Sequence, residues 1–191
     1  MTVTVTGLVL QPHDAAGMQQ VREDLLDVYR DAYADKIANP FFAEGRFWER
    51  LEAYAARYGF ELVTGHLHGR LVGYALGYTL PAKSAWWSGL LNEVDPELLV
   101  EDGRRTFALN YIMVRQAFRR IGIAEALHDA LMGDRLESRA TLLVLAENVA
   151  AFSAYQKWGW HRIGQLKPFD DAPTYEALVL DLTRPAERRL A

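Results

Sequence analysis

The chain has 191 residues, of which 50% are hydrophobic and 24% are charged, and its formal net charge is −4. A chain of this size and composition buries a sizeable core, and its acidic balance argues against a nucleic-acid partner. It has no cysteine, which excludes disulfides, thiolate metal sites and a cysteine nucleophile. This absence fits the reducing cytoplasm, where we expect the protein to work, and no apolar run is long enough for a membrane span.

The chain is expected to begin with a strand followed by a long helix. Polar and apolar residues alternate over Thr2–Leu10, as they do in a half-buried strand. Asp14 is placed to cap a helix that runs to about Ala34. The dipeptide Asn39-Pro40 then breaks the helical pattern, because a residue before proline avoids the helical conformation.

A second helix and a hairpin are expected next. Apolar residues at helical spacing predict the helix over residues 47–58, and Gly59 is its stop. Phe60–His66 and Leu71–Thr79 alternate as two strands. His68-Gly69 lies between them and predicts a tight turn, so these strands should pair antiparallel.

The second half of the chain starts with a long insert, residues 81–104, which is irregular apart from one helical turn near residues 96–100. Strands and helices then alternate until two closing strands. In order, the expected elements are Thr106–Val114, Ile121–Leu136, Thr141–Ala146, Asn148–Trp158, Trp160–Leu166 and Thr174–Leu182.

The order of these elements predicts a mixed α/β fold. A strand, a helix and a second strand in the centre demand a parallel pair with a right-handed crossover, whereas the flanking hairpins demand antiparallel pairs. We therefore expect a mixed, mostly antiparallel sheet with helices on both faces. It should form one domain over residues 1–183, followed by a basic tail over residues 184–191.

The connection between the strand ending at Val114 and the next helix has the character of a phosphate site. Arg119 and Arg120 supply charged donors there, and Gly122 opens the helix without a Cβ. Unpaired N–H groups and the positive end of the helix dipole favour an anion at such a position. The spacing Arg-x-x-Gly-x-Ala, which begins at Arg119 in this connection, also occurs at Arg70–Ala75. That second copy lies inside a predicted strand and is not followed by a helix.

Two blocks of sequence together resemble the GNAT (GCN5-related) N-acetyltransferase family. The first, Val114-x4-Arg119-x-x-Gly122-x-Ala124, is similar to the pyrophosphate loop of that family. The second runs from Asn148 through Tyr155 to Gly159-Trp160, and resembles the signature N-x2-A-x3-Y-x3-G-[FW]. The blocks occur in the family's order and are separated by a helix and an apolar strand.

This resemblance implies the GNAT fold, with a central parallel strand pair that splays apart and binds acetyl-CoA as co-substrate, without a metal. An amine would attack the thioester directly. The backbone N–H of Met113 would stabilise the oxyanion, and Tyr155 would protonate the leaving thiolate as general acid. The residues implied in binding coenzyme A are Ile112, Met113, Val114, Arg119, Arg120, Ile121, Gly122, Ile123, Ala124, Asn148 and Tyr155. For Tyr155 the alternative is packing in the core, and for Asn148 it is a helix cap, which is compatible with binding.

The general base is the point at which the chain departs from the family's pattern. Many members place a carboxylate on one of the two central strands, but the corresponding positions here are Ala108 and Leu143. Glu147, just past the strand end, is a weak candidate. A water relay or an acidic residue of the insert, such as Glu93, Asp95, Glu101 or Asp102, remains an alternative.

Two aromatic-rich regions are candidates for the acceptor site, because the family usually builds its acceptor wall from the corresponding elements. The candidate residues are Tyr29, Tyr33, Phe41, Phe42, Trp86 and Trp87. The alternatives are core packing or the contact surface of a homodimer. Two functions follow: an acetyl-CoA-dependent N-acetyltransferase acting on a primary amine of a small molecule or a protein N-terminus, or a non-catalytic acyl-CoA-binding module that serves as a sensor or structural partner.

Overall fold

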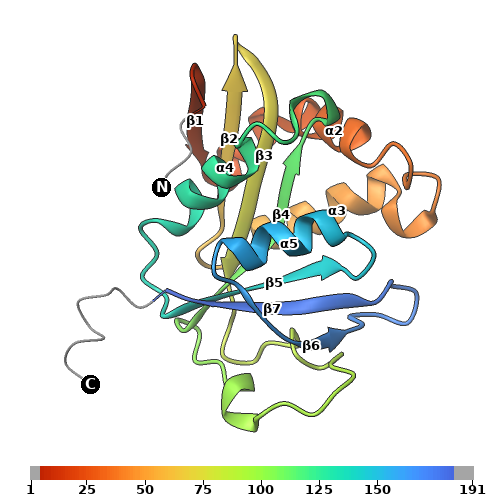
Figure 1. Ribbon diagram of the computed structural model, residues 1–191, viewed down its shortest axis with the longest axis vertical. Coiled ribbons are helices and arrows are strands. Elements are labelled where there is room, and N and C mark those ends of the chain that lie inside the picture. Colours follow the sequence, from red (N-terminus) through yellow and green to blue (C-terminus); the bar gives the residue numbers. More distant parts are fainter. Residues whose placement is uncertain (1–4, 183–191) are drawn as a thin grey trace. The chain divides into compact units, whose positions relative to one another are not determined.

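The computed structural model describes residues 5–182 (Figure 1). Its strand β4 (Thr106–Val114) is divided between two compact units. Within the described residues, unit 1 consists of residues 5–78 together with Asn110–Asp134, and unit 2 consists of Thr79–Leu109 together with residues 135–182. The protein has the mixed α/β fold that the sequence predicts. A single domain over residues 1–183 stays a prediction, and the basic tail lies outside the described residues.

The strands of unit 1 form an antiparallel meander. β1 (Leu8–His13) pairs with β2 (Glu61–Leu67), which pairs with β3 (Arg70–Thr79). His68 and Gly69 join β2 to β3 with φ values of +50° and +76°, the left-handed conformation that a tight hairpin turn requires at both positions. The predicted turn is therefore confirmed. The copy of the loop pattern at Arg70–Ala75 lies in β3, as expected from its context.

The first predicted helix is in fact two helices. α1 spans Ala15–Gln20, with the Asp14 carboxylate accepting the N–H of Gly17 at 2.8 Å, so the predicted cap is confirmed. α2 spans Arg22–Ala32, and the break falls at Val21 (φ −103°, ψ 18°). The single helix was wrong because the apolar spacing continues in register across Val21, so periodicity does not reveal this change in the backbone.

The remaining helices of unit 1 cover its strands on two faces. α3 (Glu44–Ala55) follows a short 3₁₀ turn, η1 (Pro40–Phe42), and packs with α1 and α2 around Leu62, Tyr74 and other buried residues. α4 (Ile123–Met132) lies on the opposite face. Its Leu127 side chain comes within 3.4 Å of where Gly65 and Gly73 would carry a Cβ, so these glycines let the helix pack closely on β2 and β3.

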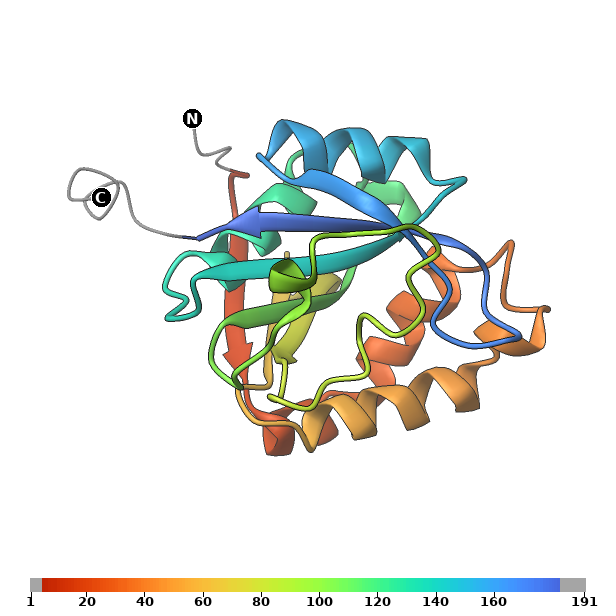
Figure 2. The same ribbon diagram turned by 90° about the horizontal axis from the view of Figure 1, so that it is seen from below.

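Unit 2 contains the predicted parallel pair. The strand order is β4-β5-β7-β6, and β4 runs parallel to β5 (Arg139–Leu145) over the pairs from Thr106–Arg139 to Leu109–Leu142. β6 (His161–Leu166) and β7 (Tyr175–Asp181) complete the sheet in antiparallel pairs. α5 (Val149–Lys157) lies on one side of these strands, and the insert lies on the other (Figure 2).

The insert is anchored to its own unit. It contains one 3₁₀ turn, η2 (Pro96–Leu99), where the sequence predicts a helical turn. Leu91 donates its N–H to the Gln165 carbonyl, and Lys167 donates to the Gly89 carbonyl, both at 2.9 Å, so the insert covers the edge strand β6. Trp87 is 6% exposed and packs with residues of β6 and β7. Its side chain thus belongs to the core of unit 2.

Candidate functional site

The connection from β4 to α4 has an open helix N-terminus. Arg120 and Gly122 both adopt left-handed conformations, with φ values of +66° and +92°. Gly122 is the N-cap of α4 and contributes no side-chain hydrogen bond. The first bond of the helix runs from the Ala126 N–H to the Gly122 carbonyl at 3.0 Å. The N–H groups of the first turn before Ala126 therefore have no partner within the helix, which makes this a suitable place for an anion.

Helix α2 holds this connection in place. The buried guanidinium of Arg115 donates to the Leu71 carbonyl at 2.8 Å and to the Asp27 carboxylate at 2.5 Å. Asp31 accepts the backbone N–H of Gln116 at 2.6 Å, and its own carbonyl accepts the Gln116 side chain at 2.7 Å. Asp27 and Asp31 were missed from the sequence, although their spacing of four residues places two carboxylates on one face of α2.

The two predicted arginines of the loop differ in their surroundings. Arg119 donates to the Val114 carbonyl at 3.3 Å and to the Ala32 carbonyl at 3.1 Å, so its guanidinium helps to shape the loop. Arg120 is exposed and adjoins the left-handed Gly122 turn. Within this part of the site, Arg120 is the better placed of the two cations to meet a phosphate.

The predicted binding residues of β4 lie in the part of the strand that belongs to unit 1. Met113 is 3% exposed, and its sulfur accepts the hydroxyl of Tyr74 at 3.1 Å. β3 passes so close that a Cβ on Gly73 would come within 2.6 Å of the Met113 carbonyl oxygen. The buried amide oxygen of Asn110 has no hydrogen-bond partner among the described residues. Since an unsatisfied buried acceptor is costly, this atom is suited to a ligand donor.

Asn148 and Tyr155 lie on α5 in unit 2. The Asn148 side chain caps the helix by accepting the N–H of Ala151 at 3.2 Å, which confirms its predicted role as a helix cap. The Tyr155 ring packs edge-on against Trp158 and Trp160, at centroid distances of 5.5 and 5.9 Å. Burial raises the pKa of Tyr155 well above its usual value, so its hydroxyl keeps its proton.

The candidate bases of the sequence lie in different surroundings. Glu147 is exposed at the end of β5. Three acidic residues of the insert are engaged elsewhere: Glu101 is ion-paired with Arg139 at 2.8 Å, and Asp95 and Asp102 accept backbone N–H groups in their own turns. Of these candidates only Glu101 is buried, and Glu147 shares its exposure with Glu93, Asp95 and Asp102.

The two central-strand positions are apolar and occupied by packing. Ala108 is fully buried on β4, and Leu143 on β5 packs against the cluster that contains Trp87. Neither position offers a proton acceptor.

Across residues 5–182, no group of three or more His, Asp and Glu side chains could hold a metal ion. Within the same range, no helix has the length and apolar character needed to cross a membrane.

The candidate acceptor residues are buried to different degrees. Tyr29 is 1% exposed, stacks on Phe47 at 3.8 Å and donates its hydroxyl to the Phe42 carbonyl, so its placement favours core packing. Tyr33 and Phe42 are partly exposed, whereas Phe41 is buried. In unit 2, Trp86 is partly buried, and its indole N–H has no partner among the described residues.

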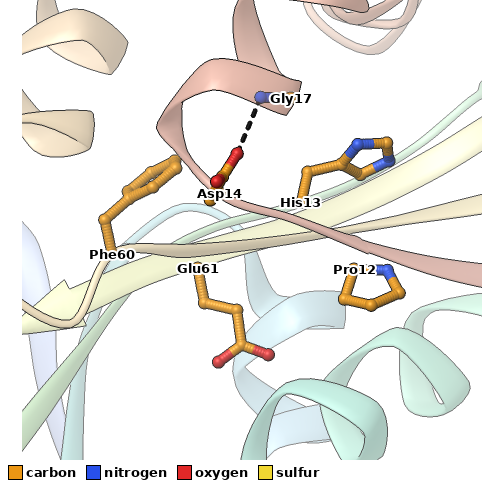
Figure 3. A pocket seen from close by; sticks show the side chains of 6 residues that line it. All are labelled: Pro12, His13, Asp14, Gly17, Phe60 and Glu61. Atoms are coloured by element: carbon orange, nitrogen blue, oxygen red, sulfur yellow. Dashed lines mark hydrogen bonds between the residues drawn. The ribbon is translucent and has the colours of Figure 1, made fainter.

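A pocket of about 470 Å³ lies at the start of α1, where β1 and β2 meet (Figure 3). It is lined by Pro12, His13, Asp14, Gly17, Phe60 and Glu61. None of the predicted site residues lines it. One Asp14 oxygen is already used to cap α1, as the dashed line in Figure 3 shows.

Known proteins share the fold of this chain. The acetyltransferase (GNAT) family model matches residues 18–160. Ard1 from Thermoplasma volcanium is 16% identical with a TM-score of 0.63, covering 94% of this chain and 100% of that one. The ribosomal-protein-S18-alanine N-acetyltransferase from Escherichia coli is 14% identical with a TM-score of 0.60, covering 93% and 95%. PaiA N-acetyltransferase from Thermoplasma acidophilum, in complex with coenzyme A, is 10% identical with a TM-score of 0.55, covering 91% and 98%.

At these identities the solved structures show a shared fold, and no curated protein matches the sequence. The family model, by contrast, covers well over half of the chain and includes both sequence blocks. The chain therefore belongs to the acetyltransferase (GNAT) family.

Proposed function

We propose that the protein is an acetyl-CoA-dependent N-acetyltransferase, acting in the cytoplasm on a primary amine of a small molecule or a protein N-terminus. The observation that carries this proposal is the open N-terminus of α4, with Gly122 and Arg120 in left-handed conformations. Its backbone N–H groups and the Arg120 guanidinium suit the pyrophosphate of coenzyme A.

The proposed reaction needs no covalent bond to the enzyme. The amine attacks the thioester carbonyl, an amide bond forms, and the carbon–sulfur bond breaks to release the thiol. Acetyl-CoA would supply the activated acetyl group, and the proton that the attacking nitrogen loses would pass to water. The Met113 backbone N–H would stabilise the charge that develops on the carbonyl oxygen, and the raised pKa of Tyr155 keeps a proton available for the departing sulfur.

The second candidate is a non-catalytic acyl-CoA-binding module. It is favoured by Ala108 and Leu143, which leave the two central strands without a carboxylate at the positions that many family members use. Both candidates require coenzyme A to bind, but only an enzyme releases thiol in proportion to an added amine.

The test combines binding with turnover. Acetyl-CoA should raise the Tm of the protein, because a ligand that binds only the folded state stabilises it. The Gly122→Glu variant should lose this shift, since its carboxylate would repel the pyrophosphate. Arg70→Glu, in the second copy of the pattern, is the matched control and should keep the shift. Thiol release with a panel of amines then separates the enzyme from the binding module.

A further inference from the structure

Arg50 on α3 is a partly buried cation for which the described residues provide no acidic partner. Its guanidinium donates to the Phe41 carbonyl at 3.1 Å and lies 5.0 Å from the centroid of the Phe41 ring. It also hydrogen-bonds the hydroxyl of Tyr111, and it interacts electrostatically with the hydroxyls of Tyr54 and Tyr29. Over residues 5–182, no carboxylate forms an ion pair with it.

Three other arginines that join elements of the fold are each paired with a carboxylate. Arg30 bonds Glu44 at 2.5 Å, Arg115 bonds Asp27 at 2.5 Å, and Arg139 bonds Glu101 at 2.8 Å. Removing a guanidinium from water without a counter-charge is costly, and the group cannot lose its proton to avoid that cost. Arg50 therefore differs from these structural arginines, since the part of the chain that the structure describes supplies it with no anion.

The surroundings of Arg50 preserve its charge. Burial acts to lower the pKa of Arg50, but the neighbouring tyrosine hydroxyls, Tyr111 first, act against it, and the net pKa is raised. The rings around it also contact one another. The ring centroid of Tyr111 lies 5.4 Å from that of Phe47 and 6.4 Å from that of Tyr54. A partly exposed cation inside an aromatic shell can bind an anion that carries an apolar group.

Tyr111 connects this cation to the proposed chemistry. It lies on β4 two residues before Met113, and alternate residues of a strand share one face. Both side chains belong to the core formed with α1–α3, the face on which Arg50 contacts Tyr111. The proposed function requires the Met113 backbone to meet the thioester. Arg50 then lies on the same side of β4 as the aromatic rings, and these rings can hold an acceptor there.

We propose that Arg50 binds a carboxylate of the acceptor, so that the acceptor is a small amine carrying both a carboxylate and an apolar or aromatic group. A free amino acid with such a side chain has this chemistry. The guanidinium fork would hold the carboxylate in two parallel hydrogen bonds, and the rings of Phe41 and Tyr111 would contact the apolar part. This inference rests on the proposed acetyl transfer and adds the substrate class to it.

The test uses pairs of amines that differ by the carboxylate alone: phenylalanine with 2-phenylethylamine, and leucine with 3-methylbutylamine. For the wild type, kcat/KM should favour the amino acid by about tenfold or more, the effect of a hydrogen-bonded charge. In Arg50→Gln the ratio should fall to about one while turnover of the plain amines persists. Arg50→Lys should keep part of the preference, because it retains the charge without the fork.

Arg46→Gln is the matched control. It removes the same charge from the other arginine that lies over the Phe41 ring, at 4.9 Å, and should leave the ratio unchanged. A wild-type preference for the plain amines, or an Arg50→Gln variant that keeps the wild-type ratio, would overturn the proposal. So would an equal loss of the ratio in both variants, which would indicate a general effect of charge.

A binding measurement separates this proposal from the acetyl transfer on which it rests. With coenzyme A present, N-acetylphenylalanine should raise the Tm of the wild type more than N-acetyl-2-phenylethylamine does, and Arg50→Gln should abolish the difference. Equal shifts for the two compounds would refute carboxylate recognition even if amines are acetylated. A difference between the two Tm shifts without any turnover of amines would show that Arg50 binds a carboxylate, and it would refute the proposed acetyl transfer.

Discussion

Tyr155 shows how one residue combines a structural and a chemical property. Its ring packs against Trp158 and Trp160, and burial raises the pKa of its hydroxyl. Two roles were predicted for it from the sequence, core packing and acid catalysis, and the burial of the side chain is relevant to both. A phenol with a raised pKa is a weak acid towards water, but it remains protonated throughout the pH range in which an amine is nucleophilic.

Tyr155→Phe should separate these two roles. The variant keeps the ring contacts and deletes only the hydroxyl, so kcat should fall by about 10²-fold while the Tm shift with acetyl-CoA is retained. Because the pKa is raised, the wild-type kcat should show no loss from ionisation of Tyr155 up to about pH 10, where an ordinary tyrosine titrates. Steady-state kinetics against pH provide the measurement, and an unchanged kcat in the variant would leave Tyr155 with packing alone.

At the scale of elements, α2 and the loop after β4 act as one assembly. Hydrogen bonds from three loop residues, Arg115, Gln116 and Arg119, reach Asp27, Asp31 and the Ala32 carbonyl. Tyr29 and Tyr33, which the sequence assigns to the acceptor wall, lie on α2 or at its C-terminal end. A shift of α2 would therefore change the geometry of the loop after β4, which we propose binds coenzyme A.

Asp31→Ala should test whether this helix positions the loop. The substitution removes the acceptor of the Gln116 N–H, so the KM for acetyl-CoA should rise about threefold to tenfold while kcat changes little. Asp24→Ala, an exposed change on the same helix, is the control and should leave both constants unchanged. A fall in kcat with an unaltered KM would argue against a positioning role.

The insert is held by a second assembly, in unit 2. Glu101 accepts the Trp87 indole N–H at 2.9 Å and the Arg139 guanidinium at 2.8 Å, and Arg139 also donates to Thr106 at 2.7 Å. The Glu101 and Arg139 side chains are 2% and 8% exposed. A buried pair of this kind is sensitive to the loss of one partner, because the other is left charged and unpaired.

Glu101→Ala should therefore destabilise the protein by about 3 kcal/mol or more, measured by chemical unfolding. Glu97→Ala, an exposed change in the same insert, should cost less than about 0.5 kcal/mol. Replacing both partners, Glu101→Leu with Arg139→Met, should recover much of the loss, since no uncompensated charge remains. A single variant as stable as the wild type would contradict this anchoring of the insert.

At the scale of the whole molecule, the chain crosses between its two units three times, and one crossing falls inside β4 between Leu109 and Asn110. Neither unit is a continuous segment, so each depends on chain from both halves of the sequence. We therefore expect residues 1–183 to unfold as one domain. Far-ultraviolet circular dichroism and tryptophan fluorescence should give a single coincident transition, whereas two separate transitions would show that the units unfold independently.

Much of this fold was predictable because its signals are local. The turn at His68-Gly69, the cap at Asp14 and strand β4 were correct from residue type and an apolar run alone. The long helix before Asn39 was wrong, since the break at Val21 leaves the apolar spacing unchanged. The two family blocks also lie within single short segments, which is why the family could be identified from the sequence.

The sequence by itself determined the family, the order of the strands, the parallel pair and the loop that opens α4, because each depends on neighbouring residues or on a short spacing. Only the tertiary structure showed that Asp31 on α2 holds this loop through Gln116, and that Arg139 is the partner of Glu101. It also showed that Arg50 has no anionic partner within residues 5–182. These contacts join residues that are far apart in the chain, and a partner across such a separation leaves no periodic or compositional trace. Local signals identify which elements form, whereas the pairing of each buried charge depends on how those elements pack.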